Sequence, residues 1–211
     1  SRPACTAMMQ GNTVVNNYFH DLSRNGIFAF RNQGGNLFAY NRIDNAMLTT
    51  LDGGGIHMAT MNKLAAPTYC VGNVISNIWG MDRTRDGRGT RHIARGIFLD
   101  WFTSSMIMRN NLTYNTWRGG YCVLGGNDNL FQNNVVVRDP NGMDLAYNWG
   151  KSQGTGNAEL NNIVVKGGDG PIVAPASGDF RLSEDFAYPD GFEFFDRSEE
   201  HTSELQSRQS I

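Results

Sequence analysis

The sequence predicts an all-β fold, a right-handed parallel β-helix (solenoid) of about six coils, and three observations lead to it. A glycine that opens a short apolar strand recurs along the chain, and an asparagine in a second short strand follows it each time. Where no insertion intervenes, the period is 22 to 24 residues, a spacing typical of solenoids. The strands are only 4 to 6 residues long, which excludes a solenoid of helical repeats.

The repeating elements follow one another in a fixed order. The strand-opening glycines are Gly26, Gly55, Gly96, Gly120, Gly142 and, more weakly, Gly170. The asparagines at the centres of the second strands are Asn17, Asn41, Asn73, Asn111, Asn134 and Asn162. Because equivalent strands pair one turn apart, these asparagines should stack into a ladder whose amides satisfy backbone groups of the turns.

The repeat also predicts how the chain is divided. We expect the coils to span residues 1 to 177 and residues 178 to 196 to form a cap that shields the open sheet edge of the last coil. Residues 197 to 211 resemble the translation of a sequencing adapter, so we expect an artefactual, disordered tail there. The chain begins at Ser1 in the middle of a repeat, and we expect a signal peptide and further coils to precede it in the natural protein.

Charge and composition limit the function. A net charge of −2 gives no reason to expect a nucleic acid as partner. No apolar run approaches the roughly 20 residues of a membrane span. Three cysteines, Cys5, Cys70 and Cys122, have no CxxC spacing, so neither a metal site nor a disulfide framework is predicted. We expect no cofactor and a monomeric protein.

Alternation along the opening strands assigns their side chains to two faces. With each glycine counted as zero, the odd positions should face the core: Ile27, Ile56, Met58, Ile97, Leu99, Tyr121 and Val123. The even positions should face solvent and stack into one surface: Phe28, Phe30, His57, Ala59, Phe98, Asp100, Cys122, Leu124, Asp144 and Ala146.

Two neighbouring coils carry the longest connections, which should wall a groove on this surface. The segment from an asparagine to the next opening glycine has 8 or 9 residues in four coils, but 14 before Gly55 and 23 before Gly96. The first long segment contains Asp52, and the second contains the arginine-rich run 81 to 95. Aromatic side chains suited to the apolar faces of sugar rings lie beside them, namely Phe28, Phe98 and Trp101. The groove therefore favours a carbohydrate.

Asp52, His57 and Asp100 are the candidate catalytic residues, because carboxylates beside a sugar can act as acid, base or nucleophile. The strand register puts the Cβ atoms of His57 and Asp100 about 8 Å apart, so their side chains can meet directly or through one water. A straight-strand extrapolation separates Asp52 from Asp100 by more than about 20 Å, but the three glycines after Asp52 can fold it back. Each residue also has a structural explanation: a turn for Asp52, a solvated strand end for Asp100 and an exposed strand position for His57.

Further residues are candidates for substrate binding. Asp144 lies about 12 Å from Asp100 by the same arithmetic and is a weaker candidate. Arg83, Arg88 and Arg91 either form a solvated loop or bind uronate carboxylates, for which a guanidinium fork is well shaped. An acidic polysaccharide would leave a lyase open, because β-elimination needs a cation for the uronate and a base for its α-proton.

Four segments carry a resemblance to a known family: LTTLDGGGIHM (48 to 58), GIFLDWFTSSMIMRNNLTYN (96 to 115), GGYCVLGGNDNLFQNNVVV (119 to 137) and GDFRL (178 to 182). They resemble secreted right-handed parallel β-helix enzymes that act on polysaccharides, near glycoside hydrolase family 141. The resemblance covers residues 11 to 195 as a fold and 48 to 137 as motifs. It implies that Asp52 and Asp100 are the active-site carboxylates, while His57 and Phe98 stand where tyrosine is usual in the family.

We therefore expect a secreted or periplasmic glycoside hydrolase that acts on a plant or microbial polysaccharide through two aspartates. Two alternatives stay open from the residues alone. One is a lyase on a uronate-containing glycan, and the other is a β-helix that binds glycan without cleaving it.

Overall fold

A computed structural model describes residues 5–59, 66–81, 93–137, 143–147 and 154–193. Within these ranges the protein is all-β, with three six-stranded sheets and no α-helix. Sheet A contains β1 (Cys5–Gln10), β4 (Ile27–Gly34), β7 (Gly54–Ala59), β10 (Arg95–Asp100), β13 (Tyr121–Leu124) and β16 (Met143–Tyr147). Sheet B contains β2 (Thr13–Val15), β5 (Leu37–Ala39), β8 (Thr68–Val71), β11 (Met106–Arg109), β14 (Leu130–Gln132) and β17 (Ala158–Leu160). Sheet C contains β3 (Tyr18–His20), β6 (Arg42–Asp44), β9 (Val74–Ile78), β12 (Leu112–Thr116), β15 (Val135–Val137) and β18 (Ile163–Val165).

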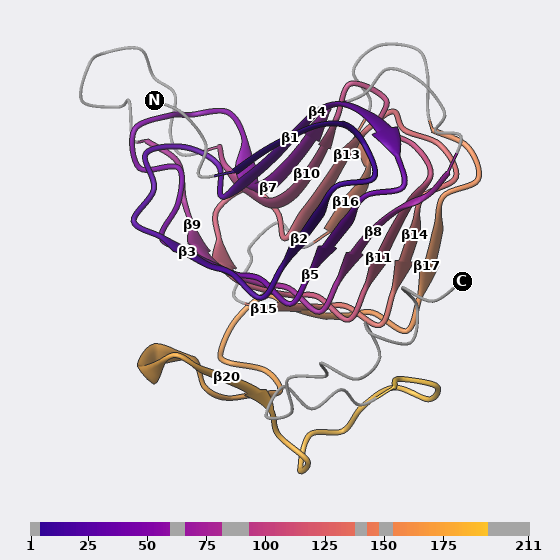
Figure 1. The fold of residues 1–211 in the computed structure, drawn as a ribbon. Coiled ribbons are helices and arrows are strands. Elements are labelled where there is room, and N and C mark those ends of the chain that lie inside the picture. The colour runs from indigo at the N-terminus through magenta and orange to yellow at the C-terminus, as the bar shows by residue number, and fades with distance from the viewer. Residues whose placement is uncertain (1–4, 60–65, 82–92, 138–142, 148–153, 194–211) are drawn as a thin grey trace.

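Every strand of these sheets is parallel to its neighbour, and consecutive strands of the chain go to different sheets (Figure 1). Each strand pairs with the strand three places further along the chain, so that β4 pairs with β7 and β7 with β10. The register puts Ile56 between Ile27 and Ile97. The predicted stacking of equivalent parallel strands is therefore confirmed. The strands at the two ends of each sheet have a partner on one side only, so the sheets are not closed.

The asparagine segments form two strands each, which corrects the prediction of one strand centred on the asparagine. Asn17 lies between β2 and β3, and Asn111 lies between β11 and β12. The residue before each of these asparagines has a positive φ, 58° at Asn16 and 55° at Asn110. Such a left-handed residue bends the chain sharply, and asparagine adopts this conformation more readily than most residues. Each bend carries the chain from sheet B to sheet C.

The predicted asparagine ladder runs along this corner. The Nδ2 atom of each ladder asparagine donates to the Oδ1 atom of the next, at 3.0 Å from Asn17 to Asn41 and at 2.9 Å from Asn73 to Asn111. The same Oδ1 atoms accept the backbone N–H of the preceding ladder residue, at 3.0 Å from Asn73 to Asn111. The ladder thus satisfies polar groups that burial would otherwise leave without partners.

The core lies between the three sheets. It contains Ile27 from sheet A, Phe38 from sheet B and Ile43 from sheet C, all fully buried. The residues predicted to face inward from the opening strands, from Ile27 to Val123, are all at most 1% exposed. The inward half of the predicted alternation is therefore confirmed.

The C-terminal segment departs from the sequence prediction in two ways. The strand after Gly170, β19 (Ile172–Ala174), does not join sheet A but pairs antiparallel with β20 (Asp179–Leu182) across the 3-10 helix η2 (Pro175–Ser177). This hairpin covers the outer face of sheet C rather than a sheet edge, because Phe180 packs on Tyr114 at 5.8 Å between ring centroids and lies under the Arg42 guanidinium. Residues 194 to 211, which include the expected tail, lie outside the described residues.

Candidate functional site

The candidate site lies on the outward side of three neighbouring strands of sheet A. The register aligns Phe28 of β4, His57 of β7 and Phe98 of β10 side by side. The rings touch in that order, with centroids 5.0 Å apart between Phe28 and His57 and 4.8 Å apart between His57 and Phe98. His57 is therefore enclosed between two aromatic rings.

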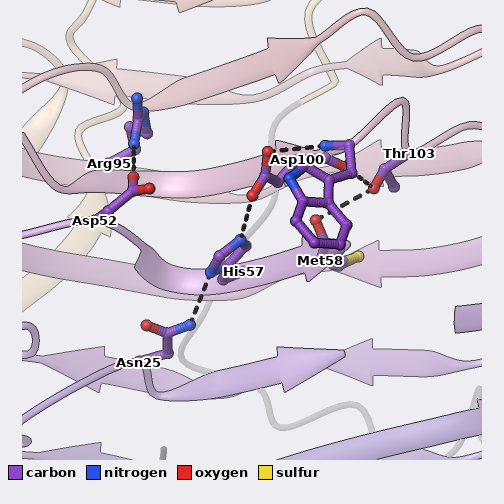
Figure 2. A network of polar contacts seen from close by, with 8 residues as sticks. Asn25, Asp52, His57, Met58, Arg95, Asp100 and Thr103 are labelled. Atoms are coloured by element: carbon purple, nitrogen blue, oxygen red, sulfur yellow. Dashed lines mark hydrogen bonds and ion pairs between the residues drawn. The ribbon is translucent and has the colours of Figure 1, made fainter. Parts of the chain in front are cut away.

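His57 is the centre of a chain of hydrogen bonds that joins β7 to β10 and to the segment before β4 (Figure 2). The Asn25 Nδ2 atom lies 3.0 Å from His57 Nδ1, and His57 Nε2 lies 3.3 Å from Asp100 Oδ2. With the amide nitrogen as donor, Nδ1 accepts this hydrogen bond, which leaves the ring proton on Nε2. The Nε2–H group then donates a hydrogen bond to the carboxylate. Both ring nitrogens are thus engaged, and only 8% of the side chain is exposed.

Asp100 ends β10 at a sharp turn that fixes its carboxylate. Trp101 and Phe102 both have positive φ, 48° and 60°, and the backbone N–H of Trp101 donates to Asp100 Oδ1 at 2.8 Å. The Thr103 hydroxyl donates to the backbone carbonyls of Asp100 and Met58, which ties the turn to β7 (Figure 2). The Asp100 side chain is 14% exposed, so its held carboxylate still reaches the surface. The predicted proximity of His57 and Asp100 is confirmed as a direct contact.

Asp52 has a different partner. Its Oδ1 atom accepts from Arg95 Nη1 at 2.7 Å, and the Arg95 guanidinium lies 4.0 Å from the centre of the Phe98 ring. The Gly-rich connection therefore brings Asp52 back towards the aromatic rings of sheet A. The carboxylate of Asp52 is 65% exposed, whereas the Arg95 side chain is almost completely buried.

Gly53 links the two halves of the site. It has a φ of +147°, a conformation that side-chain-bearing residues rarely adopt. A Cβ atom there would lie 2.5 Å from Asn25 Oδ1 and 2.8 Å from Met47 Cε. Only glycine lets Asp52 approach Arg95 while Asn25 holds His57.

The contacts therefore form one continuous series across the site. Asp52 pairs with Arg95, Arg95 stacks on Phe98, Phe98 stacks on His57, and His57 bonds to Asp100. The structure brings both predicted carboxylates to the same surface, but each has its own cationic or N–H partner. Their environments differ as well, since Asp52 is open to solvent and Asp100 is mostly covered.

The exposure predicted for several of these residues is wrong. Phe98 is 1% exposed and His57 6%, because the neighbouring rings and the Arg95 guanidinium cover them. Cys122, predicted to face solvent on the same surface, is also buried. Trp101 is exposed as predicted, at 52%, and Phe28 is half-buried. Trp101 also meets Phe30 edge to face, with ring centroids 6.3 Å apart.

Other predicted residues cannot be placed in this way. Arg83, Arg88 and Arg91 lie outside the described residues, as does the side chain of Asp144. The backbone of Asp144 lies in β16, opposite Cys122 of β13. Within the described ranges, no group of three or more His, Cys, Asp or Glu residues could hold a metal ion, and no helix is long and apolar enough to cross a membrane.

Two residues of the site were missed by the sequence argument. Asn25 and Arg95 each directly precede an opening glycine, Gly26 and Gly96, and the equivalent residue of β7 is Gly54. The signal that could have found them is a polar residue directly before an opening glycine, at the position where the coil of β7 has Gly54.

Comparison with known proteins adds no relative. No family model matches the chain, and neither the curated proteins nor the solved structures give a significant match.

Proposed function

We propose that the chain is part of a secreted glycoside hydrolase whose three sheets are the faces of a right-handed parallel β-helix. Crossovers between parallel strands are right-handed in nearly all known cases, which supports the handedness. The resemblance of the motifs around Asp52 and Asp100 to polysaccharide-degrading β-helix enzymes supports the reaction class. The observation that carries the proposal is the buried chain of hydrogen bonds from Asn25 through His57 to Asp100.

If this chain of hydrogen bonds had only a structural role, it would stabilise the fold less than apolar packing at the same positions. An imidazole and an amide buried without good partners cost free energy, and an apolar pair at the same positions would pack on Phe28 and Phe98 without that cost. The Asn25 Oδ1 atom is buried and has no hydrogen-bond partner, so the arrangement is not optimised for stability. Buried polar atoms without partners, such as this one, are expected at functional sites.

The geometry supports a proposed role for each residue. Asp100 is the proton-transfer group, because its carboxylate is held in one orientation and still reaches the surface. Asp52 is the second carboxylate and acts from the solvent side, as base for a water or as nucleophile. His57 has no free ring nitrogen for a substrate, so it is a positioning residue that acts through Asp100. Trp101 offers an exposed ring to a sugar.

The test is the release of reducing ends from a panel of polysaccharides that includes homogalacturonan, xylan and glucomannan. Asp100→Asn should lower kcat by at least about 100-fold on any polysaccharide that is cleaved, with the fold retained. Asp185→Asn, which changes an exposed aspartate of the C-terminal segment, is the matched control and should leave kcat unchanged.

Other outcomes would replace the proposal. Full activity in Asp100→Asn would remove Asp100 from the mechanism. Products that carry the ultraviolet absorbance of an unsaturated uronate would identify a lyase. Binding without turnover on any member of the panel would identify a glycan-binding protein.

A further inference from the structure

A pocket of about 360 Å³ lies outside the candidate site, and neither Asp52, His57 nor Asp100 lines it. Its lining is Asn45, Ala46, Met47, Leu48, Asn77, Trp79, Gly80 and Met81. These residues follow β6 or belong to the end of β9 and the segment after it, so the pocket opens where the chain leaves sheet C. Its volume falls within the range of roughly 300–1,000 Å³ that is usual for small-ligand sites.

One wall of this pocket carries the indole of Trp79, which packs against the indole of Trp117. The rings of Trp79 and Trp117 lie 5.2 Å apart between centroids at 34°, and Trp79 is 39% exposed. Leu48 beside them is 46% exposed. A large aromatic ring that is held by a second ring and still open to solvent is suited to stack on the apolar face of a sugar.

The polar groups of the pocket are neutral amides with carboxylates behind them. Asn45 Nδ2 donates to Asp21 Oδ1 at 2.6 Å, and Asn77 Nδ2 donates to Asp44 Oδ1 at 2.8 Å. Among the residues that the structure describes, no charged side chain lines the pocket. Two carboxylates behind the amides repel an anionic ring and leave a neutral one unaffected.

The pocket is joined to the candidate site through the backbone. The N–H of Met81 donates to the carbonyl of Thr50 at 3.0 Å, two residues before Asp52. A Cβ atom on Gly80 would lie 3.1 Å from both the backbone N and the Cβ of Ala94, which precedes Arg95. The pocket and the segment that carries Asp52 are therefore neighbours in the fold.

We propose that this pocket is a second sugar-binding site, in which Trp79 stacks on a pyranose ring of a neutral polysaccharide. The choice of a carbohydrate rests on the proposed function. The choice of a neutral sugar rests on the pocket alone, and it differs from the uronate that the arginine-rich segment suggested.

The experiment is affinity electrophoresis of the 211-residue chain in native gels that contain glucomannan, xylan or homogalacturonan. The wild-type protein should be retarded by glucomannan or xylan and not by homogalacturonan. Trp79→Ala should weaken that binding by about tenfold or more, because the stacking surface is lost. Tyr69→Ala removes another exposed aromatic, which lies in β8 of sheet B and is not part of the pocket lining, and it should bind like wild type.

A second variant guards against a folding defect in Trp79→Ala. Leu48→Arg places a long charged side chain in the pocket and leaves Trp79 and Trp117 unchanged. It should also abolish retardation. Asp185→Asn, at an exposed residue outside the pocket lining, should bind as tightly as wild type. Retardation by homogalacturonan alone, binding that survives both pocket variants, or no binding to any of the three polysaccharides would overturn the proposal. Binding that depends on Trp79 in a protein that cleaves nothing would uphold it and overturn the hydrolase.

Discussion

The Nε2 atom of His57 lies 3.3 Å from the Oδ2 atom of Asp100, although 43 residues separate the two in the chain. Neighbouring strands of sheet A bring them together, with Phe98 of β10 directly opposite His57 of β7. Because the Nδ1 atom of the same ring is engaged by Asn25, the imidazole can hold its N–H towards the carboxylate in one tautomer. The position of the Asp100 carboxylate thus depends on a ring that is itself almost completely buried.

Replacement of His57 tests this positioning role. His57→Phe keeps a ring between Phe28 and Phe98 but removes the N–H that Asp100 accepts, so kcat on the cleaved polysaccharide should fall about 10- to 100-fold. KM should change little, since only 8% of the His57 side chain is exposed. His57→Gln keeps an N–H donor of similar reach and should recover most of the lost kcat. Full kcat in His57→Phe would show that packing, rather than the hydrogen bond, is what Asp100 needs.

Gly53 offers a second test of how the site is assembled. In Gly53→Ala the new methyl group would meet Asn25 Oδ1 at 2.5 Å, and the φ of +147° is strained for alanine. We expect the free energy of unfolding to fall by about 2 kcal/mol or more. Asn25 must also move, so kcat should fall together with stability. Urea denaturation and kcat on the same polysaccharide measure the two effects.

Gly167→Ala is the matched control for this substitution. No atom lies within 4 Å of a Cβ built on Gly167, and its φ is outside the left-handed region. Its unfolding free energy should stay within about 0.5 kcal/mol of wild type. Equal stability of the two alanine variants would mean that Gly53 is not required by its surroundings.

The stacking of the coils was readable from the sequence because one register repeats. The alternation that placed Ile56 and Ile97 in the core depends only on the distance from the opening glycine, and this distance survives the insertions between coils. The bend at each asparagine was not readable in the same way, because a run such as VVNNYF is consistent with one strand. A single residue in the left-handed conformation, Asn16, divides it into two.

The candidate site was predicted in part. Asp52, His57 and Asp100 were found because loop length and strand parity both pointed to them, and the contact between His57 and Asp100 follows from the register. The alternation of side chains along a strand predicts the face on which a side chain lies, but not which neighbours cover it. The burial of Phe98 under Arg95 was therefore missed. Asn25 and Arg95 were missed because they lie one residue outside the strand pattern that was counted. The exposed indole of Trp79 follows β9 at the start of the longest connection, where the sequence argument considered only the arginine-rich run.

The asparagine ladder predicts a stability cost that depends on position along the stack. Asn111 is fully buried in the middle, where its Oδ1 accepts from the backbone N–H and the Nδ2 of Asn73, and its Nδ2 donates to the Cys70 carbonyl and to Asn134. Asn111→Ala leaves several buried groups without partners and should lower the free energy of unfolding by about 3 kcal/mol or more.

Asn17 at the N-terminal end of the ladder is exposed, and its amide donates to Asn41 Oδ1, which also accepts the backbone N–H of residue 17. Asn17→Ala keeps that backbone bond and leaves water free to replace the lost one, so the cost should stay within about 1 kcal/mol. Urea denaturation of the two variants gives the difference directly. If both variants lose the same free energy, the ladder is a row of independent turns. A larger loss at Asn111 means that burial makes its amide a part of the fold that the neighbouring coils cannot replace.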